Sequence, residues 1–423
     1  MDGNKESEKK EDPTQRDSCL IQGKSTTVNN NSDIKKSTTS KVTVRRKVTR
    51  RQKGGSKIIH TGTNRKRNIV SLSTPFHEKS LVLRLLQLVK IQNPSLNDKI
   101  CSNFSLFSLG NILDDCIKKG IEGLTIDFLS IAKQKLEPAE YVTFLFPENR
   151  QRNRYRDIPC LENARVKIKD TTNDYIHANY VKTLRSDKSF ICTQGPTAKS
   201  SVEFWKMCIQ EEVEYIVMLC QFEENSIKKC AKYYPYEAGC TLAFGSVIVT
   251  NEKINESPDI NLRDVNLKIQ YEGGSKKIRH LQYLRWPDKG VPELFDTLLN
   301  MLDIIKNSNK PVVVHCSAGI GRTGTFVLIQ NIIERVYNPE NGGNDTTINI
   351  LKEMRTQRYG VVQTDFQYIF AHRVVLENYI KIKKIDIETH KDLNKWITFY
   401  KKIYEKYATT CKPTKTGTIE EET

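Results

Sequence analysis

The residues best suited to chemistry lie in one short stretch of the chain, from Pro311 to Phe326. Three valines lead into His315 and Cys316, and five residues separate the cysteine from Arg322. A cysteine thiolate is a nucleophile, and an arginine offers a planar fork that can bind two phosphate oxygens at once. The stretch therefore combines a candidate nucleophile with a candidate anion-binding group.

The elements around this pair predict how it is positioned. The β-branched run before His315 indicates a buried strand, and apolar residues at helical spacing from Phe326 onward indicate a helix. A loop between them aims its backbone N–H groups and the positive end of the helix at one point, which favours an anion and a thiolate. We expect the loop backbone to bind that anion through Ser317, Ala318, Gly319, Ile320 and Gly321.

The order His315-Cys316, five residues, Arg322-Thr323-Gly324 resembles the signature of the classical, non-receptor type protein tyrosine phosphatases. The resemblance extends over about residues 110–383. It implies that Cys316 attacks phosphorus, that Arg322 holds the phosphate and that Thr323 hydrogen-bonds the sulfur when it leaves. The alternative is a buried structural cysteine before an ordinary strand-to-helix turn.

Trp286-Pro287-Asp288 resembles the mobile acid loop of that family, with Trp286 and Gly290 as hinges. The resemblance implies that Asp288 protonates the leaving tyrosine oxygen and then deprotonates the attacking water. Lys289 replaces the aromatic residue or histidine that is usual there. We expect this neighbouring cation to favour the ionised form of Asp288.

Arg152 to Ile158 resembles the family's substrate loop. Carried over, Tyr155 would stack on a phosphotyrosine ring and Asp157 would accept hydrogen bonds from the substrate backbone. The alternative is a basic surface turn.

Two more segments resemble supporting loops of the family. Glu224 to Pro235 implies a pairing of Glu224 with Arg322 and a place for Lys229 near the pocket rim; the alternative is a hairpin with exposed charges. Gln363 to Tyr368 implies that Gln363 positions the hydrolytic water and that Gln367 assists. Read without the family, both glutamines are polar residues at a helix start.

The resemblance implies an α/β fold, with a twisted, mixed central sheet flanked by helices. Apolar spacing predicts helices at 80–92, 112–131 with a break near Gly120, 204–211, 294–305, 347–357, from 363 onward and 393–404. Alternating residues on both sides of Gly273-Gly274 predict a β-hairpin.

Residues 1–75 contain no phenylalanine, tyrosine or tryptophan, and residues 1–74 carry +11 of the net charge of +17. We expect a disordered basic tail. Its segments 41–53 and 64–67 fit nuclear-import signals or contacts with acidic partners; the alternative is a solvated tail without a specific partner. The remaining chain is expected to form a short helical extension at 76–109, a catalytic domain at 110–384, and a C-terminal helix with a polar tail at 385–423.

No apolar run approaches the ~20 residues needed to span a bilayer, and the eleven cysteines contain no Cys-x-x-Cys pair. We expect an intracellular protein with reduced thiols rather than disulfides or zinc, cytoplasmic with nuclear import through the tail, and a monomer. Neither a metal nor an organic cofactor is expected.

The sequence thus predicts hydrolysis of phosphotyrosine in proteins through a phosphocysteine intermediate. The alternatives are a phosphotyrosine-binding module without strong catalysis, a dual-specificity or lipid phosphatase, and a nucleic-acid binder led by the basic tail. The intact cysteine, arginine, aspartate and glutamine argue against the first, and the Tyr155 block argues against the second.

Overall fold

The computed structural model describes residues 80–93, 109, 111–131, 135–184, 189–338 and 346–410. The predicted disordered tail of residues 1–75, with its basic segments 41–53 and 64–67, lies outside these residues. So does the polar tail after residue 410.

The described strands form a nine-stranded mixed sheet in the order β1-β2-β3-β11-β4-β10-β9-β8-β7. The pairs β3/β11, β11/β4 and β4/β10 at its centre are parallel, and the pairs toward both edges are antiparallel. The strands are β1 (Arg165–Lys167), β2 (Tyr175–Lys182), β3 (Ser189–Thr193), β4 (Tyr215–Met218), β7 (Thr241–Phe244), β8 (Val247–Asn255), β9 (Leu262–Tyr271), β10 (Gly274–Tyr283) and β11 (Val312–His315). All four residues of β11 are buried, as expected of a central strand with both faces covered. The predicted mixed sheet is confirmed.

The hairpin predicted around Gly273-Gly274 is formed by β9 and β10, which pair from Tyr271 with Gly274 to Leu262 with Tyr283. Both glycines have positive φ angles of 99° and 151°. Glycine adopts such angles without the steric penalty of a Cβ atom. The hairpin ends at Tyr283, and the acid loop, residues 284–295 between β10 and α5, begins directly after it. The hairpin therefore fixes the position of the first residue of that loop.

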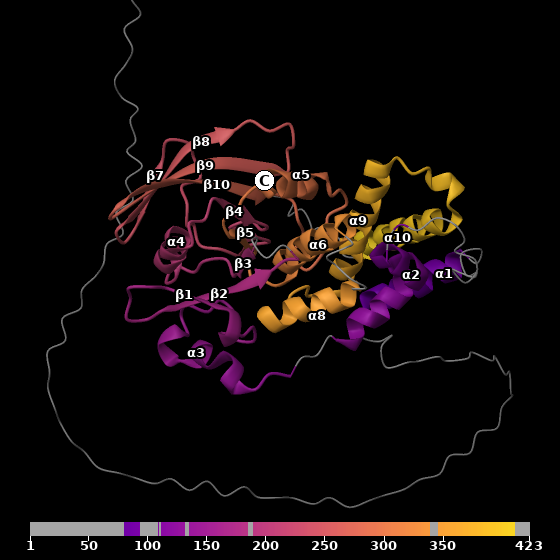
Figure 1. Cartoon of the computed structure of the whole chain (residues 1–423), viewed down its shortest axis with the longest axis horizontal. Helices are drawn as coiled ribbons and strands as arrows, with labels where there is room; N and C mark the ends of the chain where they lie inside the picture. Colours follow the sequence, from indigo (N-terminus) through magenta and orange to yellow (C-terminus); the bar gives the residue numbers. More distant parts are fainter. Residues whose placement is uncertain are drawn as a thin grey trace, which may run out of the picture. The chain divides into compact units, whose positions relative to one another are not determined.

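Helices flank the sheet (Figure 1). Five of them are α4 (Ser201–Gln210), α5 (Asp296–Ile305), α6 (Gly321–Tyr337), α8 (Thr347–Gln357) and α9 (Asp365–Lys383), of which α6 and α9 carry site residues. The first of the leucines expected in the helix at 294–305 does not belong to it, because Leu294 precedes α5 and is 64% exposed. That leucine matched the helical spacing by chance within the turn that leads into the helix.

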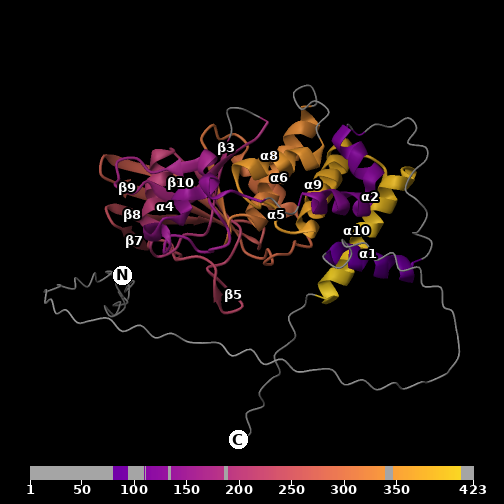
Figure 2. The same cartoon turned by 90° about the horizontal axis from the view of Figure 1, so that it is seen from below.

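Three helices from the two ends of the described chain pack together beside α9: α1 (Leu81–Gln92), α2 (Asn111–Ser130) and α10 (Lys391–Thr410) (Figure 2). The expected break in α2 is present, since Gly120 has a φ of 59° and a ψ of −178°. Ser80 caps α1 by accepting a hydrogen bond from Leu83 N–H and donates one to Asp365 Oδ2 at 2.5 Å. The N-terminal helix is thereby attached to the start of α9.

The remaining short elements are the helix α3 (Val142–Leu145), the 3-10 turns η2 (Pro138–Tyr141), η3 (Pro147–Asn149), η4 (Glu162–Ala164) and η5 (Ile387–Thr389), and the two-stranded hairpin β5 (Glu223–Glu224) and β6 (Ile227–Lys228). The eight cysteines among the described residues are all free thiols, and seven of them are buried. In this described part of the chain, no helix is both long enough and apolar enough to cross a membrane.

Candidate active site

Cys316 follows directly after β11, and α6 begins five residues later at Gly321. The loop between them, residues 316–320, is called the catalytic loop below. It turns so tightly that a Cβ atom on Gly319 would lie 2.1 Å from the Thr193 carbonyl oxygen. Gly319 also has a φ of 70°, in the left-handed region. Its N–H group donates to Cys316 Sγ at 3.3 Å. The loop therefore curls around the sulfur and needs glycine to do so.

The carbonyl groups of this loop are held away from the sulfur by their partners. Gly195 N–H donates to the Ser317 carbonyl at 2.9 Å, and the Arg358 guanidinium donates to the Ala318 and Gly319 carbonyls at 3.2 and 2.6 Å. In a planar trans peptide the N–H group points opposite to the C=O group. The N–H groups that follow these carbonyls are thus left to face an anion in front of Cys316.

Arg322, on the first turn of α6, is held as a fork. Its two terminal nitrogens each donate to one Glu224 carboxylate oxygen at 2.6 Å, and Nη1 also donates to the Leu219 carbonyl at 2.8 Å. Burial lowers the pKa of this guanidinium, but the hydrogen bonds with Glu224 and the nearby negative charge together outweigh burial and raise the pKa. The fork is therefore charged and fixed in one plane, by the pairing with Glu224 expected from the sequence.

The alternative interpretation of the Glu224 segment was a hairpin with exposed charges, and the hairpin is formed by β5 and β6. Asn225 and Ser226 both have positive φ angles, 49° and 60°, which is the geometry of a type I′ turn. The Glu224 side chain, however, is only 14% exposed and faces Arg322. The hairpin thus presents a partly buried carboxylate to the site.

Asp288 contacts the Arg322 fork, with its Oδ1 3.0 Å from Arg322 Nη2. Its other oxygen, Oδ2, accepts a hydrogen bond from Lys229 Nζ at 2.6 Å. Burial alone raises the pKa of Asp288, but Lys229 and Arg322 together bring the pKa below its ordinary value. The expected influence of Lys289 stays a prediction, since Lys289 is exposed and the ion pairs of Asp288 are with Lys229 and Arg322.

These side chains surround a pocket of about 130 Å³. It is lined by Tyr155, Asp157, Ile158, Asp288, Lys289, Cys316, Ser317, Ala318, Gly321, Arg322, Gln363 and Gln367. Ile158 is a lining residue to which the sequence analysis assigned no role. Its apolar character, next to the predicted substrate loop, was the available signal.

Three residues expected at the site stand behind this lining: Gly319, Ile320 and Thr323. The Thr323 hydroxyl is buried and makes no hydrogen bond within the described part of the chain. The expected hydrogen bond from Thr323 to the sulfur concerns the step in which the sulfur leaves, so it stays a prediction.

Tyr155 forms one wall of the pocket. The side chain is half-buried, and its hydroxyl lies 2.8 Å from Ser317 Oγ in the catalytic loop. The tyrosine ring therefore spans the distance between the substrate loop and the catalytic loop. Asp157 also lines the pocket and is exposed, at a position where it can meet a substrate backbone.

The two glutamines are brought together in the pocket lining. Gln367 is buried, and its Oε1 accepts a hydrogen bond from Gln363 N–H at 3.0 Å. A Cβ atom on Gly321 would lie 3.1 Å from Gln363 Oε1 and 3.2 Å from Gln367 Nε2. A side chain on residue 321 would thus press on both amides and force them to shift.

Two supporting groups were missed by the sequence analysis. One is Arg358, a fully buried arginine just after α8 that orients the catalytic loop as described above. The other is Tyr233, whose hydroxyl lies 2.7 Å from His315 Nε2 and 2.6 Å from His280 Nε2. Neither residue stands out in the sequence, because Arg358 follows Thr356 and Gln357 and Tyr233 lies between Lys232 and Tyr234.

The direction of the hydrogen bonds through Tyr233 follows from the partners at either end. His315 Nδ1 faces the Cys316 carbonyl at 3.2 Å, so this nitrogen must carry the proton. Tyr233 then donates to His315 and accepts from His280. Burial lowers the pKa of His315 to about 4, which keeps the ring neutral. The predicted supporting residue His315 thus fixes the carbonyl of the candidate nucleophile.

Comparison with known proteins identifies the family to which this geometry corresponds. The family model described as protein-tyrosine phosphatase matches residues 149–377. Among curated proteins, the chain is 33% identical over 252 residues to tyrosine-protein phosphatase non-receptor type 9 of Mus musculus, covering 55% of this chain and 42% of the relative. It is 34% identical over 245 residues to the human non-receptor type 12 protein, covering 55% and 31%.

A solved structure of PTPN18, described in connection with distinct HER2 tyrosine phosphorylation sites, superposes with a TM-score of 0.53 at 27% identity. The superposition covers 61% of this chain and 92% of that structure. The chain spans less than half the length of the two curated relatives. The similarity therefore concerns the phosphatase domain that these proteins share.

Proposed function

The chain belongs to the protein-tyrosine phosphatase family, and from this premise we propose that it hydrolyses phosphotyrosine in proteins through a phosphocysteine intermediate. The observation that carries the proposal is the pocket in which Cys316, the Arg322 fork and Asp288 meet. Within the proposal, residues 110–384 form the catalytic domain.

In the first step the Cys316 thiolate attacks phosphorus, and the bond from phosphorus to the tyrosine oxygen breaks. Arg322 and the loop N–H groups bind the non-bridging oxygens, whose negative charge the fixed fork can follow into the transition state. Asp288, in its protonated form, gives its proton to the leaving oxygen. A bound phosphate raises the pKa of Asp288, because it brings negative charge close and competes for Arg322.

In the second step water attacks the phosphocysteine. Asp288, now a carboxylate, takes a proton from the water while the phosphorus–sulfur bond breaks, which restores the thiolate and releases phosphate. Gln363 would orient that water, since its side chain lies at the start of α6 beside the catalytic loop. Gln367 fixes Gln363 through the backbone hydrogen bond at 3.0 Å.

The proposed substrate class follows from the Tyr155 wall. The Tyr155 side chain reaches from the substrate loop to Ser317 in the catalytic loop. The depth of the pocket is therefore about the length of one tyrosine side chain. A phosphotyrosine side chain of matching length would place its phosphorus at Cys316. Phosphoserine and phosphothreonine are shorter, so their phosphorus would stop above the loop.

The test is release of phosphate from a phosphotyrosine peptide by the purified full-length chain, with Cys316→Ser as the matched variant. We expect turnover by the wild type and none by the variant, because no other residue is proposed to bond to phosphorus. Tight peptide binding without turnover by the wild type would favour the binding-module alternative instead. Iodoacetate should alkylate Cys316, and phosphate or vanadate should slow that reaction.

We further propose that the basic residues in the N-terminal 74 positions direct nuclear import or bind acidic partners, and that the protein acts inside the cell as a monomer. The charge of +11 in that segment supports the first part. Localisation of the chain with and without residues 1–74 tests the import role, and size-exclusion chromatography with light scattering tests the oligomeric state.

A further inference from the structure

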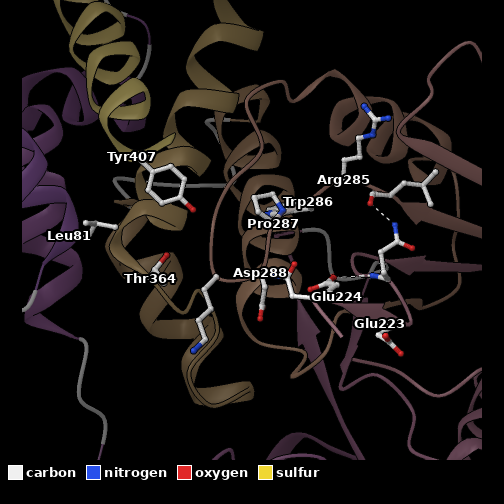
Figure 3. Close-up of a pocket in the computed structure, with 13 residues that line it drawn as sticks. Leu81, Glu223, Glu224, Arg285, Trp286, Pro287, Asp288, Thr364 and Tyr407 are labelled. Atoms are coloured by element: carbon white, nitrogen blue, oxygen red, sulfur yellow. Dashed lines mark hydrogen bonds between the residues drawn. The ribbon is translucent and has the colours of Figure 1, made fainter. Parts of the chain in front are cut away.

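The acid loop is contacted by a helix that lies outside the family match. That match ends at residue 377, whereas α10 covers Lys391–Thr410. Tyr407 of α10 and Leu81 of α1 line a second pocket, of about 690 Å³, together with Trp286, Pro287, Asp288 and Lys289. Figure 3 shows Tyr407 on its helix with the hydroxyl directed toward Pro287 and Trp286. Two segments remote in sequence thus abut the loop that bears the proposed general acid.

Gly290 is the point of closest approach between α10 and this loop. A Cβ atom on Gly290 would lie 2.1 Å from the Tyr407 hydroxyl oxygen and 3.3 Å from Tyr407 Cζ. The tyrosine therefore rests directly on the glycine backbone. The buried Gly290 leaves no room between the two elements for even a methyl group.

Gly290 also contacts Gln367 in the lining of the first pocket. Its carbonyl accepts hydrogen bonds from Trp286 Nε1 at 3.0 Å and from Gln367 Nε2 at 3.4 Å. Between Gly290 and Asp288 stands Lys289, with a φ of 55°. Left-handed backbone costs free energy for any residue with a Cβ atom, so this loop conformation depends on its surroundings for support.

The position of α10 is itself well fixed. Trp396, Tyr400 and Ile403 are buried, and the Tyr407 ring packs on Phe366 of α9 with centroids 4.5 Å apart. The contact with the loop therefore does not depend on a freely moving helix end.

A second link joins α10 to the far end of the acid loop. Arg373 of α9 donates to the Glu293 carbonyl at 3.0 Å, while its guanidinium lies 4.7 Å from the centre of the Tyr400 ring. The loop thus contacts α9 and α10 at Gly290, and at Glu293 it contacts an arginine of α9 that also lies against α10.

We propose that Tyr407 is a positioning residue for the general acid: by packing on Gly290, it holds the acid loop where Asp288 lies against Arg322. This inference rests on the proposed phosphatase activity and assigns α10 a part in it. Tyr407 itself does not touch the reacting atoms. It acts by restricting the loop to the conformation in which the 3.0 Å contact between Asp288 and Arg322 forms.

The test compares Tyr407→Ala with the wild type on two substrates that differ in leaving group. A phosphotyrosine peptide needs a proton on its leaving oxygen, whereas para-nitrophenyl phosphate releases a much more acidic phenol. We expect kcat for the peptide to fall about tenfold, which is part of the roughly 10²–10⁴-fold that a general acid supplies. The loss on para-nitrophenyl phosphate should be much smaller, and the rate of Cys316 alkylation by iodoacetate should not change.

Tyr404→Ala is the matched control, because Tyr404 also packs on Phe366 from α10, with centroids 6.3 Å apart, but does not line the second pocket. It should lose comparable thermal stability without the dependence on leaving group. Equal losses on both substrates in Tyr407→Ala would indicate general damage and overturn the inference.

A double-mutant cycle serves if Tyr407→Ala folds poorly. Gly290→Ala forces a methyl group against the Tyr407 hydroxyl, so it should lower kcat for the peptide in the wild type. Tyr407→Phe removes that hydroxyl. In the Tyr407→Phe background, Gly290→Ala should therefore lower kcat several-fold less than it does in the wild type. Additive losses would contradict the contact.

An inactive wild type would refute the proposed function and this inference together. If the wild type is active and Tyr407→Ala has the same kcat on the peptide, only the inference is refuted.

Discussion

Lys229 and Asp288 form an ion pair at the pocket, with Nζ and Oδ2 2.6 Å apart. The Lys229 side chain is 9% exposed and that of Asp288 is 39% exposed. Burial alone raises the pKa of Asp288, yet the hydrogen bonds from Lys229 and Arg322 lower it overall. The proposed general acid is therefore ionised at neutral pH before substrate arrives.

This pairing predicts how the pH profile responds to lysine substitution. A general acid must be protonated in order to act, so a lowered pKa moves the descending limb of kcat/KM toward lower pH. Lys229→Met removes a lowering influence and should raise the pKa of Asp288. The descending limb should then move to higher pH, as measured by kcat/KM across a pH series.

Lys289→Met is the matched control, since it removes an equal charge from the neighbour of Asp288. Its profile should move less than that of Lys229→Met, because the ion pairs of Asp288 are with Lys229 and Arg322. A larger shift for Lys289→Met would show that charge proximity along the chain matters more than the contact.

Removal of the acid itself should separate turnover from binding. Asp288→Ala is expected to lose roughly 10²–10⁴-fold in kcat on a phosphotyrosine peptide. Binding of that peptide should be kept or strengthened, since one negative charge leaves the pocket and Arg322 loses a competing partner. Single-turnover kinetics and calorimetry on the same variant measure the two effects, and unchanged turnover would assign the acid role elsewhere.

The Arg358 guanidinium should support anion binding without touching the anion. Arg358→Lys keeps a positive charge but loses the fork that holds the Ala318 and Gly319 carbonyls. Unsatisfied buried groups cost about 1–3 kcal/mol each, and a misdirected loop should weaken vanadate inhibition about tenfold, equivalent to ~1.4 kcal/mol.

Arg355→Lys offers the comparison for that variant. Arg355 is also a buried arginine that donates to carbonyls, but those belong to Val361, Val362 and Ile131 rather than to the catalytic loop. Arg355→Lys should lower the urea concentration at which the protein unfolds, while vanadate inhibition should stay nearer to that of the wild type. Equal weakening by both variants would mean that the effect is one of stability alone.

The sequence predicted the local elements well where periodicity and glycine decide them. The helix at 347–357 has the bounds of α8, and the break near Gly120 is present, because a 3.6-residue repeat and a positive φ angle are local properties. Both features depend on residues close to one another in the chain. The pocket lining from Tyr155 to Gln367 was instead located by the resemblance of its motifs to those of the family.

Contacts between remote residues could not be predicted in this way. Lys289 stood next to the acid in the sequence and was expected to influence it, but Lys229, 59 residues away, makes the contact. Tyr233 lies 82 residues from His315. Such pairings depend on strand order and side-chain direction, which the spacing of residues in one chain does not contain.

The N-terminal segment should be separable from the chemistry. Residues 1–74 carry +11 of charge and no aromatic side chain, and the first described helix, α1, begins only at Leu81. Deletion of residues 1–74 should leave kcat on a small aryl phosphate unchanged and reduce nuclear accumulation of the chain. A large loss of turnover would mean that this segment contributes to the catalytic domain.

The choice between phosphotyrosine and shorter phosphorylated side chains should depend on Tyr155. Its hydroxyl lies 2.8 Å from Ser317 Oγ, so removing the ring removes the wall that sets the depth of the pocket. Tyr155→Ala should raise KM for a phosphotyrosine peptide by up to about tenfold, given the ~0.5–1.5 kcal/mol expected of an aromatic stacking contact. Tyr155→Phe keeps the ring and should retain most of the affinity. The measurement is phosphate release from matched phosphotyrosine and phosphoserine peptides by the three proteins. Comparable wild-type rates on the two peptides would contradict the depth argument and favour a dual-specificity phosphatase.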